Sequence, residues 1–121
     1  MTTAPLDRIQ NPTLRERIMT AEQAAELIPA GATVGMSGFT AAGAPKAVPQ
    51  ALAKRIEAIH AQGGDFRIGL WTGASTSPDL DGALAKVKGI DRRLPYQSDP
   101  EVRRQINAGE MDYTDIHLSH V

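Results

Sequence analysis

The sequence predicts an α/β fold: an open, mostly parallel sheet flanked by helices. Apolar residues alternate along the chain between helical spacing and short runs that are typical of buried strands. Glycine-bearing loops follow two of these runs, at residues 38–46 and 73–78. Strands that alternate with helices usually pair in parallel. We therefore expect these two loops, and a third at Gln97-Ser98 that follows another predicted strand, to meet at the carboxyl edge of the sheet, where open α/β sheets bind ligands.

The first helix is expected after Thr20, because Thr20 and Gln23 have the spacing of a capping box and Pro29 with Gly31 ends the pattern. A short apolar run at residues 32–37 then predicts a buried strand. The order continues as helix, strand, helix, strand and helix, at residues 45–62, 66–72, 79–87, 89–94 and 99–107.

The start of the last helix is marked by Asp99 as the cap and Pro100 at the first position, and Gly109 marks its end. Residues 111–121 show no clear pattern. We assign residues 1–12 to a flexible arm and residues 13–121 to one domain, since 121 residues allow a single domain.

Composition excludes several classes of protein. With 13 basic and 14 acidic residues the chain lacks the basic footprint of a nucleic-acid-binding protein. The absence of cysteine excludes a disulfide framework, a thiolate zinc site and a cysteine nucleophile. The longest uncharged run, residues 27–45, holds four Gly and two Pro and is unsuited to lipid. Residues 1–10 lack the apolar segment of a signal peptide, so we expect a cytoplasmic protein that contacts no membrane.

The loop at residues 38–46 has features of a phosphate-binding loop. Gly38 and Gly43 have the required separation, and the loop leads into a helix whose free N–H groups favour anions. Lys46 falls two positions late, however, and Ala44 and Pro45 interrupt the motif. A phosphate- or nucleotide-binding module therefore stays an alternative beside a plain strand-to-helix turn.

Three hydroxyl residues, Ser75, Thr76 and Ser77, follow Gly73. A nucleophilic serine elbow needs glycine at position 77, so a serine hydrolase has little support, and capping of the next helix is the simpler interpretation. Acidic residues at the start of that helix, Asp79 and Asp81, suit its dipole.

No metal site is expected. His117 and His120 lie three residues apart near Asp112 and Asp115, but the segment offers no further clear ligand and is interpreted as solvated surface.

Several short motifs span most of the chain: Ser37-Gly38-Phe39-Thr40 with Gly43, Pro45 and Lys46; Val48-Pro49; Thr72-Gly73-Ala74-Ser75-Thr76; Leu80-Asp81-Gly82; Arg103, Ile106-Asn107 and Gly109-Glu110; Tyr113; and His117-Leu118. Together they resemble the amino-terminal segment of the acetyl-CoA hydrolase/transferase family, most closely its succinyl-CoA:acetate type of class I CoA-transferase.

The resemblance implies an enzyme of two related α/β halves, of which this chain is the incomplete first half. It implies exchange of CoA between a short acyl-CoA, such as succinyl- or acetyl-CoA, and a carboxylate such as acetate, or hydrolysis of acetyl-CoA. The intermediate is a glutamyl-CoA thioester. The nucleophilic glutamate belongs to the family's carboxyl half, beyond Val121, and neither Glu57, Glu101 nor Glu110 is nominated for that role.

The residues that carry over to this chain line the substrate pocket: Gly38, Phe39, Thr40, Ser75, Arg93 and Ser98. Phe39 would shield the thioester from water, and Arg93 would contact a carboxylate or phosphate. Ser98 stands where close relatives carry threonine. The simpler alternatives are that Ser75 caps a helix, Phe39 fills the core and Arg93 lies on a solvated face.

The resemblance implies CoA as substrate without any cofactor, small carboxylates and the remainder of the enzyme as partners, and a homodimer when complete. The chain alone is expected to be inactive. Leu70, Trp71 and Ile116 are expected on the surface, uncovered without the missing half. A non-catalytic remnant or partner-dependent subunit is the other alternative.

Overall fold

The computed structural model describes residues 6–116 and 118–120 and has the expected α/β architecture. Four strands, β1 (Thr33–Gly35), β2 (Ile68–Trp71), β3 (Ile90–Leu94) and β4 (Asp112–Tyr113), form one sheet in the order β1-β2-β3-β4. All three pairings are parallel. The sheet is therefore wholly parallel, and the final strand comes from the tail that showed no sequence pattern.

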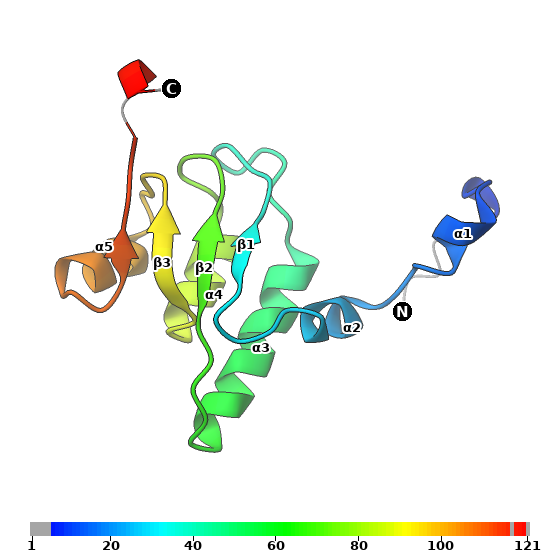
Figure 1. The fold of residues 1–121 in the computed structure, drawn as a ribbon, viewed down its shortest axis with the longest axis horizontal. Helices are drawn as coiled ribbons and strands as arrows, with labels where there is room; N and C mark the ends of the chain where they lie inside the picture. Colours follow the sequence, from blue (N-terminus) through cyan, green and yellow to red (C-terminus); the bar gives the residue numbers. More distant parts are fainter. Residues whose placement is uncertain (1–5, 117, 121) are drawn as a thin grey trace.

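The helices form one layer, behind the sheet in Figure 1. This layer contains α2 (Ala21–Glu26), α3 (Ala47–Ala61), α4 (Ala83–Lys86) and α5 (Pro100–Asn107), and a π-helical turn, η2 (Pro78–Gly82), precedes α4. The core lies between α3, α4 and the sheet, with Leu52, Ile56, Ile68, Leu70 and Ile90 fully buried. The front face of the sheet carries no helix in this part of the chain.

The predicted caps at the starts of α2 and α5 are confirmed. Thr20 accepts from the Gln23 N–H at 3.1 Å and the Gln23 side chain accepts from the Thr20 N–H at 2.9 Å, which completes the capping box. Asp99 caps α5 by accepting from the N–H groups of Glu101 and Val102. These bonds satisfy amide groups that have no partner inside the helix.

The first two strands are shorter than predicted, since β1 and β2 lose residues at both ends. Met36 still donates its N–H to the Trp71 carbonyl at 2.9 Å, so pairing runs one residue past β1. Before β2, Phe66 turns into the core, with the Arg55 guanidinium 4.8 Å from its ring centre.

The amino-terminal segment contains the 3₁₀ turn η1 (Leu6–Arg8) and the short helix α1 (Pro12–Arg15), neither of which buries a residue. A second 3₁₀ turn, η3 (Leu118–His120), follows β4. Every helix in the described ranges is too short or too polar to span a bilayer.

Candidate functional site at the carboxyl edge of the sheet

The loops that follow β1, β2 and β3 meet at the carboxyl edge of the sheet, as expected. Thr40 donates its N–H to the Ala74 carbonyl at 2.8 Å, and Ser75 donates its N–H to the Tyr96 carbonyl at 3.2 Å. These bonds join the three loops in series, and the loops lie together at the top of Figure 1. Loops that are well separated in the sequence thus form one continuous rim.

The contact between the first two loops requires glycine. A Cβ atom on Gly73 would lie 2.1 Å from the Gly38 carbonyl oxygen, far inside van der Waals distance. Gly38 itself has φ +138° and would meet Thr76 Cγ2 at 3.1 Å. The two glycines therefore permit a backbone approach that no larger residue allows.

Two residues of this rim adopt a conformation unusual for non-glycine residues. Thr40 and Ser75 both have φ +54°, in the left-handed region. Residues with side chains persist there only when their surroundings hold them, and such positions cluster at functional sites. The site thus combines backbone strain with close loop contact.

The predicted pocket residues do not all lie at the rim surface. Phe39 is 68% exposed and fills no core, while Ser75 is half-buried and Ser98 is exposed. Helix capping does not explain the hydroxyls, because Ser77 occupies the cap position of η2 and its side chain makes no capping bond.

Arg93 occupies neither of its expected positions, at a substrate or on a solvated face. Its side chain is 0% exposed, so it neither faces solvent nor offers its guanidinium to a substrate in this chain. It pairs with Asp81, the residue interpreted as a helix-start charge, at 2.8 Å. Asp81 is equally buried because the π-helical turn directs it inward beneath the loops.

Sequence reasoning missed an aromatic rim, defined here as Phe39, Trp71, Tyr96 and Tyr113. One aromatic residue comes at or just after the end of each strand, and each is 40–68% exposed. Trp71 and Ile116 are on the surface as expected, but Leu70 is fully buried because alternate strand residues face opposite sides. The positions of Phe39, Trp71 and Tyr96 close to the ends of predicted strands could have suggested this surface.

A cavity of about 160 Å³ adjoins the third loop and was also missed. Its lining includes Tyr96, Arg103, Asn107 and Tyr113, and the last three are among the motif residues named above. The Tyr113 hydroxyl donates to Asp115 at 3.1 Å, and burial raises its pKa, assisted by that hydrogen bond. The cavity has the size of a small ligand group.

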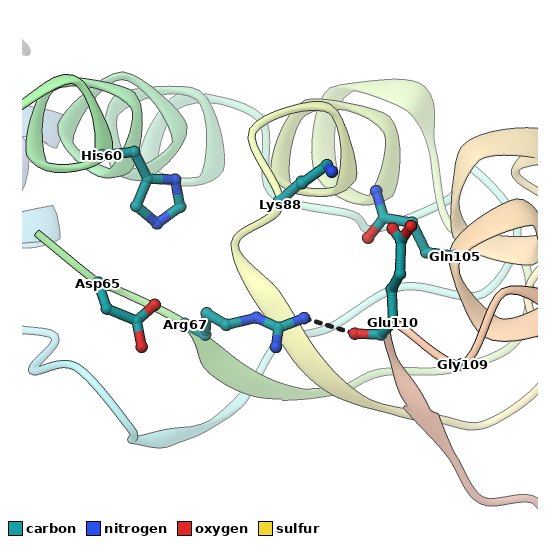
Figure 2. Close-up of a pocket in the computed structure, with 7 residues that line it drawn as sticks. All are labelled: His60, Asp65, Arg67, Lys88, Gln105, Gly109 and Glu110. Carbon is teal, nitrogen blue, oxygen red and sulfur yellow. Dashed lines mark hydrogen bonds between the residues drawn. The ribbon is translucent and has the colours of Figure 1, made fainter. Parts of the chain in front are cut away.

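A second cavity, of about 450 Å³, lies at the opposite, amino edge of the sheet (Figure 2). Charged side chains line it, and Arg67 donates to the Glu110 carbonyl at 2.6 Å. No residue expected to line the substrate pocket contributes to this lining.

None of the three glutamates considered in the sequence joins the rim. Glu57 is exposed on α3, and Glu101 and Glu110 both pair with Arg104. Hydrogen bonds from Arg104 and Gln105 lower the pKa of Glu101 to about 2. Within the described ranges no three His, Asp or Glu side chains are grouped to hold a metal, and His117 lies outside those ranges.

Comparison with known proteins matches residues 6–121 to the acetyl-CoA hydrolase/transferase N-terminal domain. The chain is 46% identical to a succinyl-CoA:acetate CoA-transferase of Clostridium kluyveri, covering 94% of this chain and 21% of that protein. It is 43% identical to a propanoyl-CoA:succinate CoA transferase of Escherichia coli, covering 85% of this chain and 21% of that protein. An acetyl-CoA hydrolase of Schizosaccharomyces pombe is 38% identical, over 93% of this chain and 22% of its own length.

Among solved structures, RipA from Yersinia pestis has the same fold, with a TM-score of 0.52 and 23% identity. The alignment covers 82% of this chain and 23% of RipA. The chain thus spans about a fifth of the relatives it matches.

Proposed function

The chain belongs to the acetyl-CoA hydrolase/transferase family as its N-terminal domain, and from this we propose that it forms one wall of an acyl-CoA site. The reaction would be CoA exchange between a short acyl-CoA and a carboxylate, or hydrolysis of acetyl-CoA. The observation that supports this most is the meeting of the loops containing Thr40 and Ser75, joined through the Ala74 carbonyl and carrying the family motifs. This chain spans about a fifth of the relatives' length, and we expect the whole-enzyme activity to need the remainder.

The proposed chemistry is a two-step exchange through a glutamate outside this chain. The carboxylate attacks the thioester carbonyl, the carbon–sulfur bond breaks, and CoA thiolate leaves a mixed anhydride. The thiolate then attacks the glutamyl carbonyl, releasing the first acid and forming a glutamyl-CoA thioester. A second carboxylate reverses these steps and takes the CoA, whereas water in its place gives hydrolysis. CoA is a substrate throughout, and the proposal needs no cofactor.

This chain would supply contacts to the reacting group. The Ser75 hydroxyl makes no hydrogen bond within the described residues and is free to donate to developing negative charge on the thioester oxygen. Phe39, which is 68% exposed, would cover the thioester and exclude water. Gly38 and Thr40 would shape the pocket, and Ser98 would face the acyl group.

The aromatic rim supports the proposal that the site is closed by the remainder of the enzyme. Exposed aromatic residues are enriched at interfaces between proteins, and the four of this rim lie near the carboxyl ends of the strands with 40–68% exposure. The partners proposed are thus acyl-CoA, small carboxylates and the remaining domains, in a homodimer, within the cytoplasm.

The direct test is a chimera. The matching segment of the Clostridium kluyveri enzyme is replaced by this chain, and succinyl-CoA:acetate exchange is measured beside the isolated chain. We expect the chimera to be active and the isolated chain to be inactive. Ser75→Ala in the chimera should lower kcat on the order of 10- to 100-fold, with an unchanged melting temperature.

A folded but inactive chimera would favour the non-catalytic remnant. Exchange by the isolated chain would require a nucleophile among its own glutamates. Binding of ATP but not of CoA by the isolated chain would favour the nucleotide-binding alternative.

A further inference from the structure

We propose that Asp81, Arg93 and Thr76 form a positioning network that holds Ser75 in its left-handed conformation. The inference rests on the proposed function, since it assigns a role to groups beneath the same site. None of these side chains would touch substrate, because Asp81 and Arg93 are 0% exposed and Thr76 is 7% exposed.

Asp81 is the centre of the network. Its Oδ1 accepts from Arg93 Nε at 2.8 Å, and its Oδ2 accepts from the Thr76 hydroxyl. Each carboxylate oxygen therefore has a separate donor, one from β3 and one from the loop after β2. The π-helical turn η2 places Asp81 between the two.

Arg93 extends the network to the end of β2. Nη1 donates to the Leu70 carbonyl at 3.1 Å, and Nη2 donates to Thr72 Oγ1 at 2.5 Å. Thr72 in turn donates its hydroxyl to the Gly73 carbonyl at 2.6 Å. All three guanidinium nitrogens thus have protein acceptors, which fixes the start of the loop.

Gln97 anchors the other side of the same loop. Its Oε1 accepts from the Thr76 N–H at 2.9 Å, and its Nε2 donates to the Gly73 carbonyl at 3.1 Å. Gln97 is 2% exposed. Hydrogen bonds to Arg93 and Gln97 therefore hold residues 72, 73 and 76. Ser75, which has φ +54°, lies between these bonded residues.

The pattern of bonds indicates positioning as well as stability. A buried ion pair contributes little net stability compared with apolar residues of the same volume, yet this one binds the hydroxyl groups of two residues of one short loop, Thr72 through Arg93 and Thr76 through Asp81. The neighbouring Ser77 hydroxyl is buried without a partner, so hydrogen bonding in the loop is selective for the residues that flank Ser75.

The test uses two substitutions of Thr76 and one control. Thr76→Val keeps the branched shape but removes the hydroxyl that Asp81 accepts, and Thr76→Ser keeps the hydroxyl. Ser77→Ala is the matched control, because its hydroxyl has no partner within the described residues. Each variant is made in the chimera and in the 121-residue chain.

We expect Thr76→Val to lower kcat on the order of 10- to 100-fold with KM nearly unchanged, as for a misplaced catalytic group. Thr76→Ser should restore kcat, and Ser77→Ala should match the wild type. In the isolated chain, the amide-to-α-proton coupling and backbone chemical shifts of Ser75 should leave their wild-type values only in Thr76→Val.

An unchanged Ser75 signal in Thr76→Val would overturn the inference, as would equal losses of kcat in Thr76→Ser or Ser77→Ala. If the wild-type chimera is inactive, the proposed function fails, while the Ser75 signal still decides whether the network holds the loop.

Discussion

The two faces of the sheet differ in what their side chains contact. Val34, Leu70 and Arg93 lie in register on the face that the helices cover, and Leu70 and Arg93 are fully buried. The open face carries Trp71, which is 49% exposed, and the Arg92–Asp112 pair. Wholly parallel sheets are normally covered on both faces, so the open face is unusual for an isolated sheet.

Arg92 and Arg93 show how much the face matters. Both are neighbours in β3 and both pair with an aspartate. The Arg93–Asp81 distance is 2.8 Å with both side chains 0% exposed, whereas the Arg92–Asp112 distance is 4.0 Å with 61% and 80% exposed. The same two residue types thus form a buried anchor on one face and a solvated contact on the other.

The largest expected effect separates these two arginines. Arg93→Ala leaves Asp81 charged and buried without its partner and should lower the free energy of unfolding by about 3–5 kcal/mol. Arg92→Ala should change it by no more than about 1 kcal/mol. Denaturant unfolding of both variants checks this, and equal losses would show that the two faces do not differ energetically.

A second pair tests apolar residues on the two faces. Leu70→Ala creates a cavity in the core and should cost about 2–5 kcal/mol. Trp71→Ala removes a half-exposed side chain and should cost less than about 1 kcal/mol in this chain. Melting temperatures of the two variants give the order, and a larger loss for Trp71→Ala would mean that the open face is covered, for example by self-association.

Substitutions of two glycines, Gly89 and Gly35, are expected to change the free energy of unfolding in opposite directions. A Cβ on Gly89 would lie 2.7 Å from Ile56 Cδ1, so Gly89→Ala should cost about 1–3 kcal/mol by overpacking. A Cβ on Gly35 would meet nothing within 4 Å, and Gly35→Ala should stabilise the chain by about 0.4–1 kcal/mol by restricting the unfolded state. Opposite signs in chemical unfolding are the expected result; a loss in Gly35→Ala would contradict it.

The smallest effect concerns Glu101, on the surface of α5. Its pKa is lowered to about 2 from 4.5, mainly by hydrogen bonding to Arg104. Because the folded pKa is the lower one, its stabilising contribution is full above pH 4.5 and is lost as the pH falls toward 2. Glu101→Gln should reduce the slope of stability against pH in that window. A slope identical to the wild type would show that this pair has no part in acid stability.

Local signals were predictable from the sequence, and contacts between distant residues were not. The capping box of Thr20 and the Asp99 cap depend on neighbours in the chain, and both are confirmed. The two-residue strand β4 is too short to show a periodicity. The Asp81–Arg93 pair joins residues from separate elements, and no spacing rule connects them.

In the candidate site, too, local features were predictable and features that depend on distant residues were not. Glycine and hydroxyl residues after the strands indicated where the loops would meet, because parallel strands end at one edge. The left-handed conformation of Ser75 was not predictable, since serine ordinarily avoids positive φ and its loop is held by groups from β3 and η2.

The strand order also has a consequence for biosynthesis. Since the spatial order β1-β2-β3-β4 equals the order along the chain, each strand can add to the free edge left by the one before it. None of the strands from β1 to β4 has to insert between two that are already paired. On the ribosome, where the amino-terminal part emerges first, this sheet can therefore assemble progressively, each new pairing needing only residues that have already been translated.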